Sequence, residues 1–424
     1  MLTPVRALQF FQVLRFGTFF LTGILFTKLG LSTYDIGVYE ALLFLGSVLS
    51  FFWLSGLTQS LLANYQPKEK SKEFFNSFLV LSAISIVVFI AFRLLITPYS
   101  FMANNPQVLY FYSTFSFYLL FIGPSFLAEY ILLLKEKANG LALYGIVAFG
   151  VQLASVVGPI AFGLGLEEAL LGLVASSVVR FLITLGLLAK YADFKLDTSY
   201  IKQFLVTAGP LVAATLLSGS AEYLDGFIVS KYFDEGTFAV YRYGAKEFPL
   251  VLLLANAFSN GMVPKVAHQG VEKAVQIIKK ESLKLMHLFF PISIGFMLVS
   301  QWAYPRLFNE DFAESAVVFN VYLLLVVSRL VFPQTLLIGL KKTKTIMLVA
   351  GLELAVNFGL SVLFVQQFGL VGIAFATVVA SVLDKLVLMV MLKSSHGVSP
   401  TSYWPWQWHL GYSVMIGMTY YLIN

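Results

Sequence analysis

Long apolar stretches recur from one end of the chain to the other, and they constrain its fold more than any other feature. A bilayer core of about 30 Å requires about 20 apolar residues for each helix that crosses it. Such stretches fill most of the 424 residues, and only 12% of the residues are charged, against about 25% in an ordinary soluble domain. No polar block is long enough to form a separate soluble domain. The sequence therefore predicts an all-α polytopic membrane protein.

Prolines and glycines interrupt the apolar stretches, so we expect twelve membrane-spanning helices. The expected ranges are 7–30, 36–64, 74–97, 106–134, 140–164, 168–191, 203–230, 237–263, 284–304, 314–340, 345–366 and 369–392. The first stretch is too long for the apolar core of a signal peptide, so we expect it to be retained. Trp404, Trp406 and Trp408 are typical of an anchor at the membrane interface. The segment after them, 408–423, is a candidate thirteenth span or one half of a hairpin.

The basic residues predict the orientation of the chain in the membrane. With the N-terminus inside, cytoplasmic segments hold 18 of the 28 Lys and Arg residues, outer segments hold six, and four lie within spans. This excess of inner positive charge places the N-terminus in the cytoplasm. The net charge of +6 thus reflects orientation, and we expect no nucleic-acid partner. From Pro264 to Lys284, lysines and apolar residues recur at helical spacing, which predicts an amphipathic helix on the inner leaflet.

The two halves of the chain resemble each other at a spacing of about 205 residues. The matching pairs, in order, are Leu134-Lys135-Glu136-Lys137 with Leu340-Lys341-Lys342-Thr343, Tyr144-Gly145 with Ala350-Gly351, Gly165-Leu166 with Gly369-Leu370, Ala175-Ser176 with Ala380-Ser381, and Arg180 with Lys385. Because each copy has an even number of helices, both copies enter the membrane from the same side, as parallel repeats. We expect two pseudo-symmetric six-helix lobes, 1–192 and 204–393, joined by a cytoplasmic linker at 193–203 and followed by a tail at 394–424. Such lobes can rock about a central site, as alternating access requires.

Four basic residues within the expected spans are candidate substrate-binding residues: Arg15, Arg180, Arg329 and Lys385. A charge at mid-membrane costs about 2.5–3.5 kcal/mol, so it faces a wet cavity or a partner. Two interpretations stay open, a cationic cavity that binds an anionic headgroup and internal ion pairs that join helices. Arg15 and Arg180 favour the cavity because neither has an acidic residue within its own helical turn, whereas Lys385 follows Asp384. Arg180 and Lys385 occupy matching repeat positions, so we expect them to face each other across the cleft.

Glu222 and Asp225 are three residues apart and share one face of the seventh expected helix. One of them could bind H⁺ or Na⁺ for coupling, and the alternative is an ion pair with Arg242 or Lys246 on the next helix. The chain has no cysteine, and its four histidines lack metal-ligand spacing. We therefore expect no metal site, no other cofactor and no catalytic residue.

Several short motifs carry a family resemblance. They are Gly37-Val38-Tyr39-Glu40, Phe51-Phe52-Trp53-Leu54-Ser55-Gly56-Leu57, Gly209-Pro210-Leu211, Asp225, Val240-Tyr241 through Glu247-Phe248-Pro249, and Val263-Pro264-Lys265. This set resembles the Wzx-type polysaccharide flippases of the MOP superfamily, which also contains MATE drug antiporters and lipid II flippases. The resemblance implies two six-helix lobes in a V and a cationic cavity, for which Arg15, Arg180 and Arg329 are well placed.

The same resemblance implies a function in O-antigen and lipopolysaccharide assembly. An undecaprenyl-diphosphate-linked oligosaccharide would move from the cytoplasmic to the outer leaflet of the bacterial inner membrane. It also implies membrane lipids and polysaccharide-assembly proteins as partners of a monomer. Arginine suits such a substrate because its guanidinium binds two diphosphate oxygens at once.

Two other functions stay open. A MATE-like cation-coupled small-molecule exporter would be favoured by acidic residues in the cavity of the first lobe, yet the first span carries Arg15 and no acid. A lipid-dependent glycosyltransferase or polymerase would also be polytopic, but such enzymes need a sizeable outer loop with catalytic residues. No expected outer loop exceeds about fifteen residues. We therefore expect a transporter and not an enzyme.

Overall fold

The computed structural model describes residues 4–96, 106–245, 251, 254–256, 258–259, 262–263, 266, 270–340 and 342–424. Within these ranges the regular secondary structure is helical, apart from one isolated β-bridge between Ser71 and Ala192. Nine helical segments of the described chain are long and apolar enough to cross a membrane. The predicted all-α polytopic membrane fold is confirmed, and the number of twelve spans stays a prediction.

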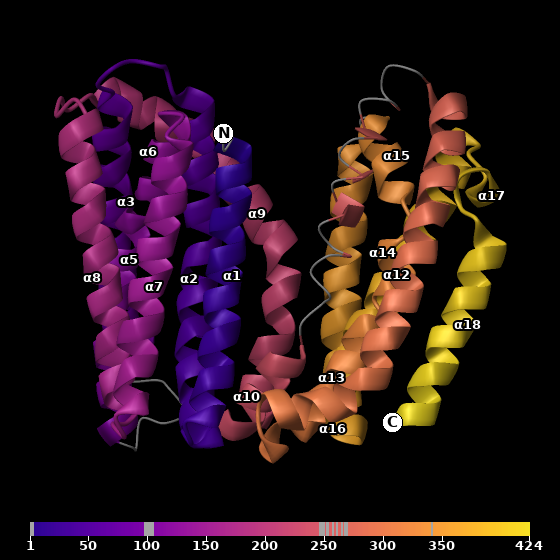
Figure 1. Cartoon of the computed structure of the whole chain (residues 1–424). Helices are drawn as coiled ribbons and strands as arrows, with labels where there is room; N and C mark the ends of the chain where they lie inside the picture. The colour runs from indigo at the N-terminus through magenta and orange to yellow at the C-terminus, as the bar shows by residue number, and fades with distance from the viewer. Residues whose placement is uncertain are drawn as a thin grey trace. The chain divides into compact units, whose positions relative to one another are not determined.

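The chain forms two compact units, Met1–Gly219 and Ser220–Asn424. The first unit contains α1 (Pro4–Lys28), α2 (Thr33–Asn64), α3 (Lys72–Ala91), the π-helical η1 (Phe92–Ile96), α5 (Pro106–Ser125), α6 (Leu127–Leu134), α7 (Ala138–Ala161), α8 (Leu166–Tyr191) and most of α9 (Thr198–Tyr232), as Figure 1 shows. The division falls within α9, downstream of the expected linker at 193–203. The lobe boundaries expected from the repeat stay a prediction.

Side chains that cap free backbone N–H groups mark the starts of helices in the first unit. Ser32 caps α2, because its hydroxyl accepts a bond of 3.0 Å from the Asp35 N–H. The Glu168 carboxylate accepts the N–H of Gly165 at 3.0 Å, just before α8. The expected fourth helix, 106–134, corresponds to one candidate span, Leu109–Leu134, in which a turn at Phe126 divides α5 from α6. Pro124 lies just before this turn, and proline has no N–H to donate to the helix.

Helix α7 packs against both α1 and α8, and a glycine allows its close approach to α8. A Cβ atom on Gly172 of α8 would lie 1.8 Å from the carbonyl oxygen of Ser155 on α7. The Ser155 hydroxyl in turn donates to the carbonyl of Gly172 at 2.9 Å. The two backbones therefore touch where α8 has no side chain.

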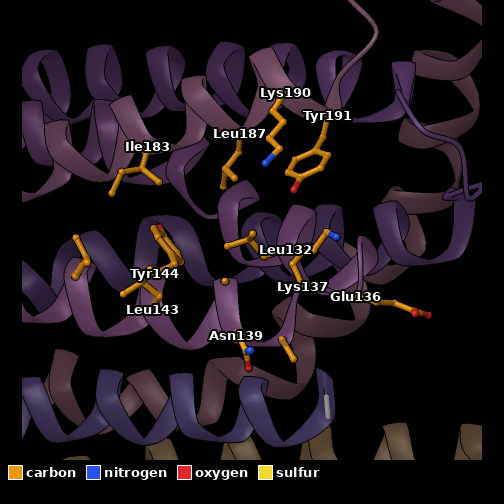
Figure 2. Close-up of a pocket in the computed structure, with 13 residues that line it drawn as sticks. Leu132, Glu136, Lys137, Asn139, Leu143, Tyr144, Ile183, Leu187, Lys190 and Tyr191 are labelled. Atoms are coloured by element: carbon orange, nitrogen blue, oxygen red, sulfur yellow. The ribbon is translucent and has the colours of Figure 1, made fainter. Parts of the chain in front are cut away.

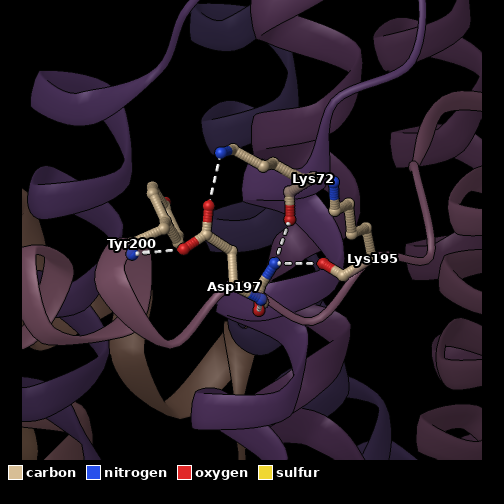
Figure 3. A network of polar contacts seen from close by, with 5 residues as sticks. Lys72, Lys195, Asp197 and Tyr200 are labelled. Carbon is tan, nitrogen blue, oxygen red and sulfur yellow. Dashed lines mark hydrogen bonds and ion pairs between the residues drawn. The ribbon is translucent and has the colours of Figure 1, made fainter.

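The start of α9 is bound to α3 by a polar network at one end of the first unit (Figure 3). Lys72 forms an ion pair with Asp197. The Asn76 amide nitrogen donates to the carbonyl of Lys195 at 2.9 Å, and its oxygen accepts the Asp197 N–H at 2.9 Å. Asp197 also caps α9 by accepting the Tyr200 N–H at 2.9 Å. The segment expected to be a linker thus has a fixed conformation on α3.

The second unit contains the end of α9, α10 (Glu235–Gly244), α12 (Val271–Leu307), the 3₁₀ turn η2 (Glu310–Phe312), α13 (Ala313–Leu323), α14 (Val326–Arg329), α15 (Pro333–Gly339), α16 (Thr343–His396), α17 (Pro400–Tyr403) and α18 (Trp406–Ile423). The expected tenth helix, 314–340, is divided into three pieces. The last of these starts at Pro333, which disfavours helical geometry in the residue before it.

Of two long helices, α12 differs from the expected ranges and α16 agrees with them. The sequence predicted a surface helix up to Lys284 and a separate span after it, but α12 is one continuous helix of 37 residues. No proline or glycine lies between Val271 and Pro291 to interrupt it. Helix α16 consists of two helices joined at a kink at Gly369, whose φ of 60° and ψ of −139° are not helical, which is the break expected between 345–366 and 369–392.

The C-terminal tail forms an 18-residue helix, α18. At 1.5 Å per residue this is about 27 Å, close to the thickness of a bilayer core. Ile416 of α18 is buried in an apolar cluster with Met286, Phe289 and Phe290 of α12. Helix α18 is not among the nine candidate spans of the described chain, and whether it crosses the membrane stays a prediction.

Candidate functional site

Arg15 on α1 is held by an acidic residue from a distant part of the first unit. Its guanidinium donates to the Glu129 carboxylate on α6 at 2.6 Å, and the Glu129 side chain is only 4% exposed. The rings of Phe11 and Phe126 each lie 5.1 Å from the Arg15 guanidinium carbon, an arrangement that favours a cation. The search for partners within one helical turn missed Glu129 because it is 114 residues away in sequence.

Arg180 on α8 is buried, with 4% of its surface exposed. Its Nε donates to the Tyr144 hydroxyl on α7 at 3.4 Å, and its guanidinium carbon lies 5.3 Å from the centre of the Phe149 ring. Glu129 interacts with Arg180 electrostatically, but within the described residues Arg180 has no ion pair. A buried cation without a paired anion is unfavourable, so this position is suited to an anionic ligand.

These residues form a cluster with excess positive charge inside the first unit. Two guanidinium groups, those of Arg15 and Arg180, share the field of one carboxylate, that of Glu129. Aromatic rings and the Tyr144 hydroxyl complete the described surroundings. Within the described residues, the two guanidinium groups are therefore only partly neutralised by the protein. We call these residues (Arg15, Glu129, Tyr144 and Arg180) the arginine cluster.

The other two predicted cations belong to the second unit. Lys385 forms an ion pair with its neighbour Asp384 on α16, with 2.8 Å between Nζ and Oδ2. Arg329 is the last residue of α14 and lines a small cavity with Ser293 and Tyr322. The expectation that Arg180 and Lys385 face each other stays a prediction.

Asp225 on α9 accepts hydrogen bonds from three neutral donors. The Thr377 hydroxyl is 2.5 Å and the Tyr322 hydroxyl 2.8 Å from its Oδ2, and the Asn357 amide nitrogen is 3.3 Å from its Oδ1. The Tyr322 hydroxyl also lies 2.6 Å from that of Tyr241 on α10. Helices α9, α10, α13 and α16 therefore meet at one carboxylate that is 5% exposed.

Further oxygen atoms lie behind these donors. The Ser361 hydroxyl donates to the Asn357 amide oxygen at 3.2 Å, and Thr377 Oγ1 lies 3.4 Å from the carbonyl oxygen of Ile373. Carboxylate, amide, hydroxyl and carbonyl oxygens are the ligands that hard cations prefer. A buried carboxylate without a cation is unfavourable, so this group of residues suits either H⁺ or Na⁺. We call Asp225, Tyr322, Asn357, Ser361 and Thr377 the Asp225 cluster.

The contacts of Asp225 clarify one alternative left by the sequence. Its described partners are the uncharged Tyr241, Tyr322, Asn357 and Thr377. Lys246 and the side chain of Glu222 lie outside the described residues. Sequence reasoning missed the two partners on α16 because they are uncharged and more than 130 residues from Asp225. The only sequence feature that marks these two partners is that each is a polar residue within an otherwise apolar helix.

Comparison with known families gives one match over most of the chain. The model of a family described as "Polysaccharide biosynthesis protein" matches residues 30–318. A probable lipid II flippase of Bdellovibrio bacteriovorus is 29% identical over 162 residues, which cover 35% of this chain. The match spans only 30% of the length of that relative.

Solved structures of two transporters share the fold of this chain. A lipid II flippase in an inward closed conformation is 16% identical, with a TM-score of 0.66 over 97% of this chain and 91% of that one. An inward-facing multidrug transporter of the MATE family is 14% identical, with a TM-score of 0.64 over 94% of this chain and 100% of that one. These likenesses confirm the predicted fold.

Proposed function

The chain belongs to the polysaccharide biosynthesis protein family, and from this membership we propose that it is a flippase for a lipid-linked oligosaccharide. The partial likeness to a lipid II flippase supports a lipid-linked precursor as substrate, and the shared fold supports a transporter of the MOP superfamily. The proposed location is the bacterial inner membrane, with the N-terminus in the cytoplasm. A transporter of this kind performs no bond-breaking chemistry, so the protein is not an enzyme.

The arginine cluster carries the proposal for the substrate. Arg180 is a buried cation with no ion pair in the described chain, next to an arginine that shares its only acidic neighbour. A diphosphate supplies the missing negative charge and presents several oxygen atoms to a planar guanidinium. We therefore assign the undecaprenyl diphosphate of the carrier lipid to Arg15 and Arg180. Arg329 and Lys385 are proposed as further contacts in the second lobe.

The Asp225 cluster carries the proposal for the driving force. A cation at Asp225 would neutralise the carboxylate and hold α9 to α16 through Thr377 and Asn357. When the cation leaves, the carboxylate is charged and buried, which disfavours the same packing. The cation therefore binds more tightly when α9 is packed on α16 than when the two helices are apart. A ligand with different affinity for two conformations shifts the equilibrium between them, as alternating access requires. Exchange of H⁺ or Na⁺ at this cluster is the proposed coupling step.

Deletion of the gene from its native host tests the flippase proposal. We expect surface polysaccharide to be lost and the lipid-linked oligosaccharide to accumulate on the cytoplasmic leaflet, where an added glycosidase cannot reach it from outside. Re-expression of the wild-type chain should restore both. If the deletion leaves the polysaccharide intact but makes the cells sensitive to cationic drugs, the chain is a MATE-like exporter instead.

A further inference from the structure

A cavity of about 640 Å³ lies in the first unit, where α6, α7 and α8 meet (Figure 2). One part of its wall is apolar and the other is basic. The apolar residues are Leu132, Leu143, Val147, Ile183 and Leu187. Leu143 is 61% exposed and Val147 is 39% exposed, so this part opens to the surface of the helix bundle. In a membrane protein such a surface is in contact with lipid chains.

The basic part is formed by Lys137, just before α7, and Lys190, in the last turn of α8. Both lysines are exposed, and within the described residues neither has an ion pair. Glu136 also borders the cavity, but Figure 2 shows its carboxylate pointing away from Lys190. Lys190 and Tyr191 extend from α8 toward α6 and α7 in the same view. The basic end therefore has two cations whose charge the protein does not neutralise.

We propose that this cavity binds an anionic glycerophospholipid. The phosphate lies between Lys137 and Lys190, and an acyl chain lies along Leu143, Val147 and Ile183. Basic pockets between membrane helices near the cytoplasmic surface bind anionic lipid headgroups in this way. The charge pattern of the sequence predicts that both lysines are on the cytoplasmic side. The inference stands on this cavity alone and does not depend on the proposed function.

The site has a consequence for the arginine cluster. Tyr144 lines the cavity and also accepts the hydrogen bond from Arg180. An acyl chain in the cavity therefore packs against the residue that positions Arg180. The bound lipid thereby stabilises the contact of α7 with α8 and touches the arginine cluster at Tyr144, but not at Arg15, Glu129 or Arg180.

Lipid-dependent thermal stability of the full-length protein tests the proposal. The purified chain in neutral detergent is titrated with phosphatidylglycerol or with phosphatidylcholine of the same acyl chains, and its melting temperature is followed. We expect phosphatidylglycerol to raise the melting temperature at lower concentration than phosphatidylcholine. In the double variant K137A/K190A, the ratio of the phosphatidylcholine to the phosphatidylglycerol concentration that gives the same rise in melting temperature should fall about 30-fold. Each lysine near a membrane surface contributes about fivefold to the binding of an anionic lipid.

Two matched controls separate the site from general effects. Lys202→Ala removes an exposed lysine of the same unit that does not line the cavity, and it should leave the preference unchanged. Leu143→Trp fills the apolar part and should weaken binding of both lipids, whereas Leu182→Trp, at a 58% exposed position of α8 outside the cavity, should not.

Three results would overturn the proposal. The first is an unchanged preference for phosphatidylglycerol in K137A/K190A. The second is equal behaviour of Leu143→Trp and Leu182→Trp. The third is displacement of phosphatidylglycerol by a polyprenyl diphosphate at equimolar concentration, which would assign the cavity to the carrier lipid.

Discussion

Thr377 on α16 donates its hydroxyl to the carboxylate of Asp225 on α9 across 2.5 Å. The two residues are 152 positions apart in sequence, and Asp225 is buried. The contact brings a carboxylate oxygen and a hydroxyl oxygen together, and both are ligands that hard cations accept. The pair is therefore the natural place to test ion coupling.

We expect Asp225→Asn to abolish transport while the protein is still inserted. Asparagine has the same shape but carries no charge, so it cannot hold H⁺ or attract Na⁺. Translocation measured in inverted vesicles should fall to background and should not respond to a Na⁺ gradient or a pH gradient. Asp234→Asn is the matched control, because Asp234 is exposed and caps α10, a role that asparagine fills equally well. An Asp225→Asn protein with unchanged gradient dependence would exclude this site from coupling.

We expect Thr377→Val to weaken rather than abolish coupling. Valine keeps the shape of threonine but removes the hydroxyl oxygen, which is a candidate neutral ligand for Na⁺ beside the carboxylate. If Na⁺ is the coupling ion, the concentration for half-maximal transport should therefore rise. If transport depends only on pH, the midpoint of its pH profile should shift instead. No change in either quantity would show that Thr377 is not a ligand.

We expect Arg180→Ala and Arg15→Ala each to abolish complementation of a flippase-null strain. Arg180→Ala breaks no ion pair in the part of the chain that the structure describes, but it removes the contacts with Tyr144 and Phe149 and leaves a cavity, so we expect some loss of stability too. Arg15→Ala breaks the ion pair of the buried Glu129 and leaves that carboxylate only the field of Arg180, so we expect it to lower stability as well.

The double variant R15M/E129Q separates stability from function. It removes both charges, so it should fold better than Arg15→Ala and yet fail to transport. Membrane abundance and complementation are measured together for all three proteins. Full activity of both single arginine variants would reject the arginine cluster as the binding site.

We expect Asp197→Asn to lower thermal stability in a manner that depends on pH. The hydrogen bond from Lys72, with that from the Tyr200 N–H, lowers the pKa of Asp197 below its usual value. The contribution of this carboxylate to stability is therefore present above the unfolded pKa of about 3.9 and is lost as the pH falls through the lowered pKa. The difference in melting temperature between wild type and variant should be largest near neutral pH and shrink below about pH 4. Asp193→Asn, at an exposed position nearby, should show no such difference.

The membrane architecture could be predicted because the bilayer imposes the length and polarity of each helix. Helix α2 (Thr33–Asn64) lies within three residues of the expected 36–64, and the break at Gly369 was expected from glycine alone. The partners of charged groups could not be predicted in the same way. Glu129 contacts Arg15, and Thr377 contacts Asp225, only because helices distant in sequence pack together. No local sequence pattern predicts such contacts. The sequence did not predict that α12 is one continuous helix. A basic amphipathic sequence has the same residue pattern whether it ends at the membrane surface or continues directly into a span.

Close packing of α7 on α8 gives the sharpest steric prediction. We expect Gly172→Ala to reduce the yield of folded protein, because the new Cβ would lie 1.8 Å from the Ser155 carbonyl oxygen and a backbone atom cannot move aside. The helices would have to separate, which also breaks the bond from the Ser155 hydroxyl to the Gly172 carbonyl. Gly186→Ala on the same helix has no neighbour within 4 Å of the new Cβ.

Gly186→Ala should therefore be neutral or slightly stabilising, since alanine favours a helix by about 1 kcal/mol over glycine. Ser155→Ala separates the two effects, because it removes the hydrogen bond without adding an atom to the contact. We expect its loss of stability to lie between those of the two glycine variants. Detergent extracts of the three proteins, compared by size-exclusion elution and melting temperature, measure this order. Equal behaviour of Gly172→Ala and Gly186→Ala would mean that α7 and α8 are not in contact at Ser155.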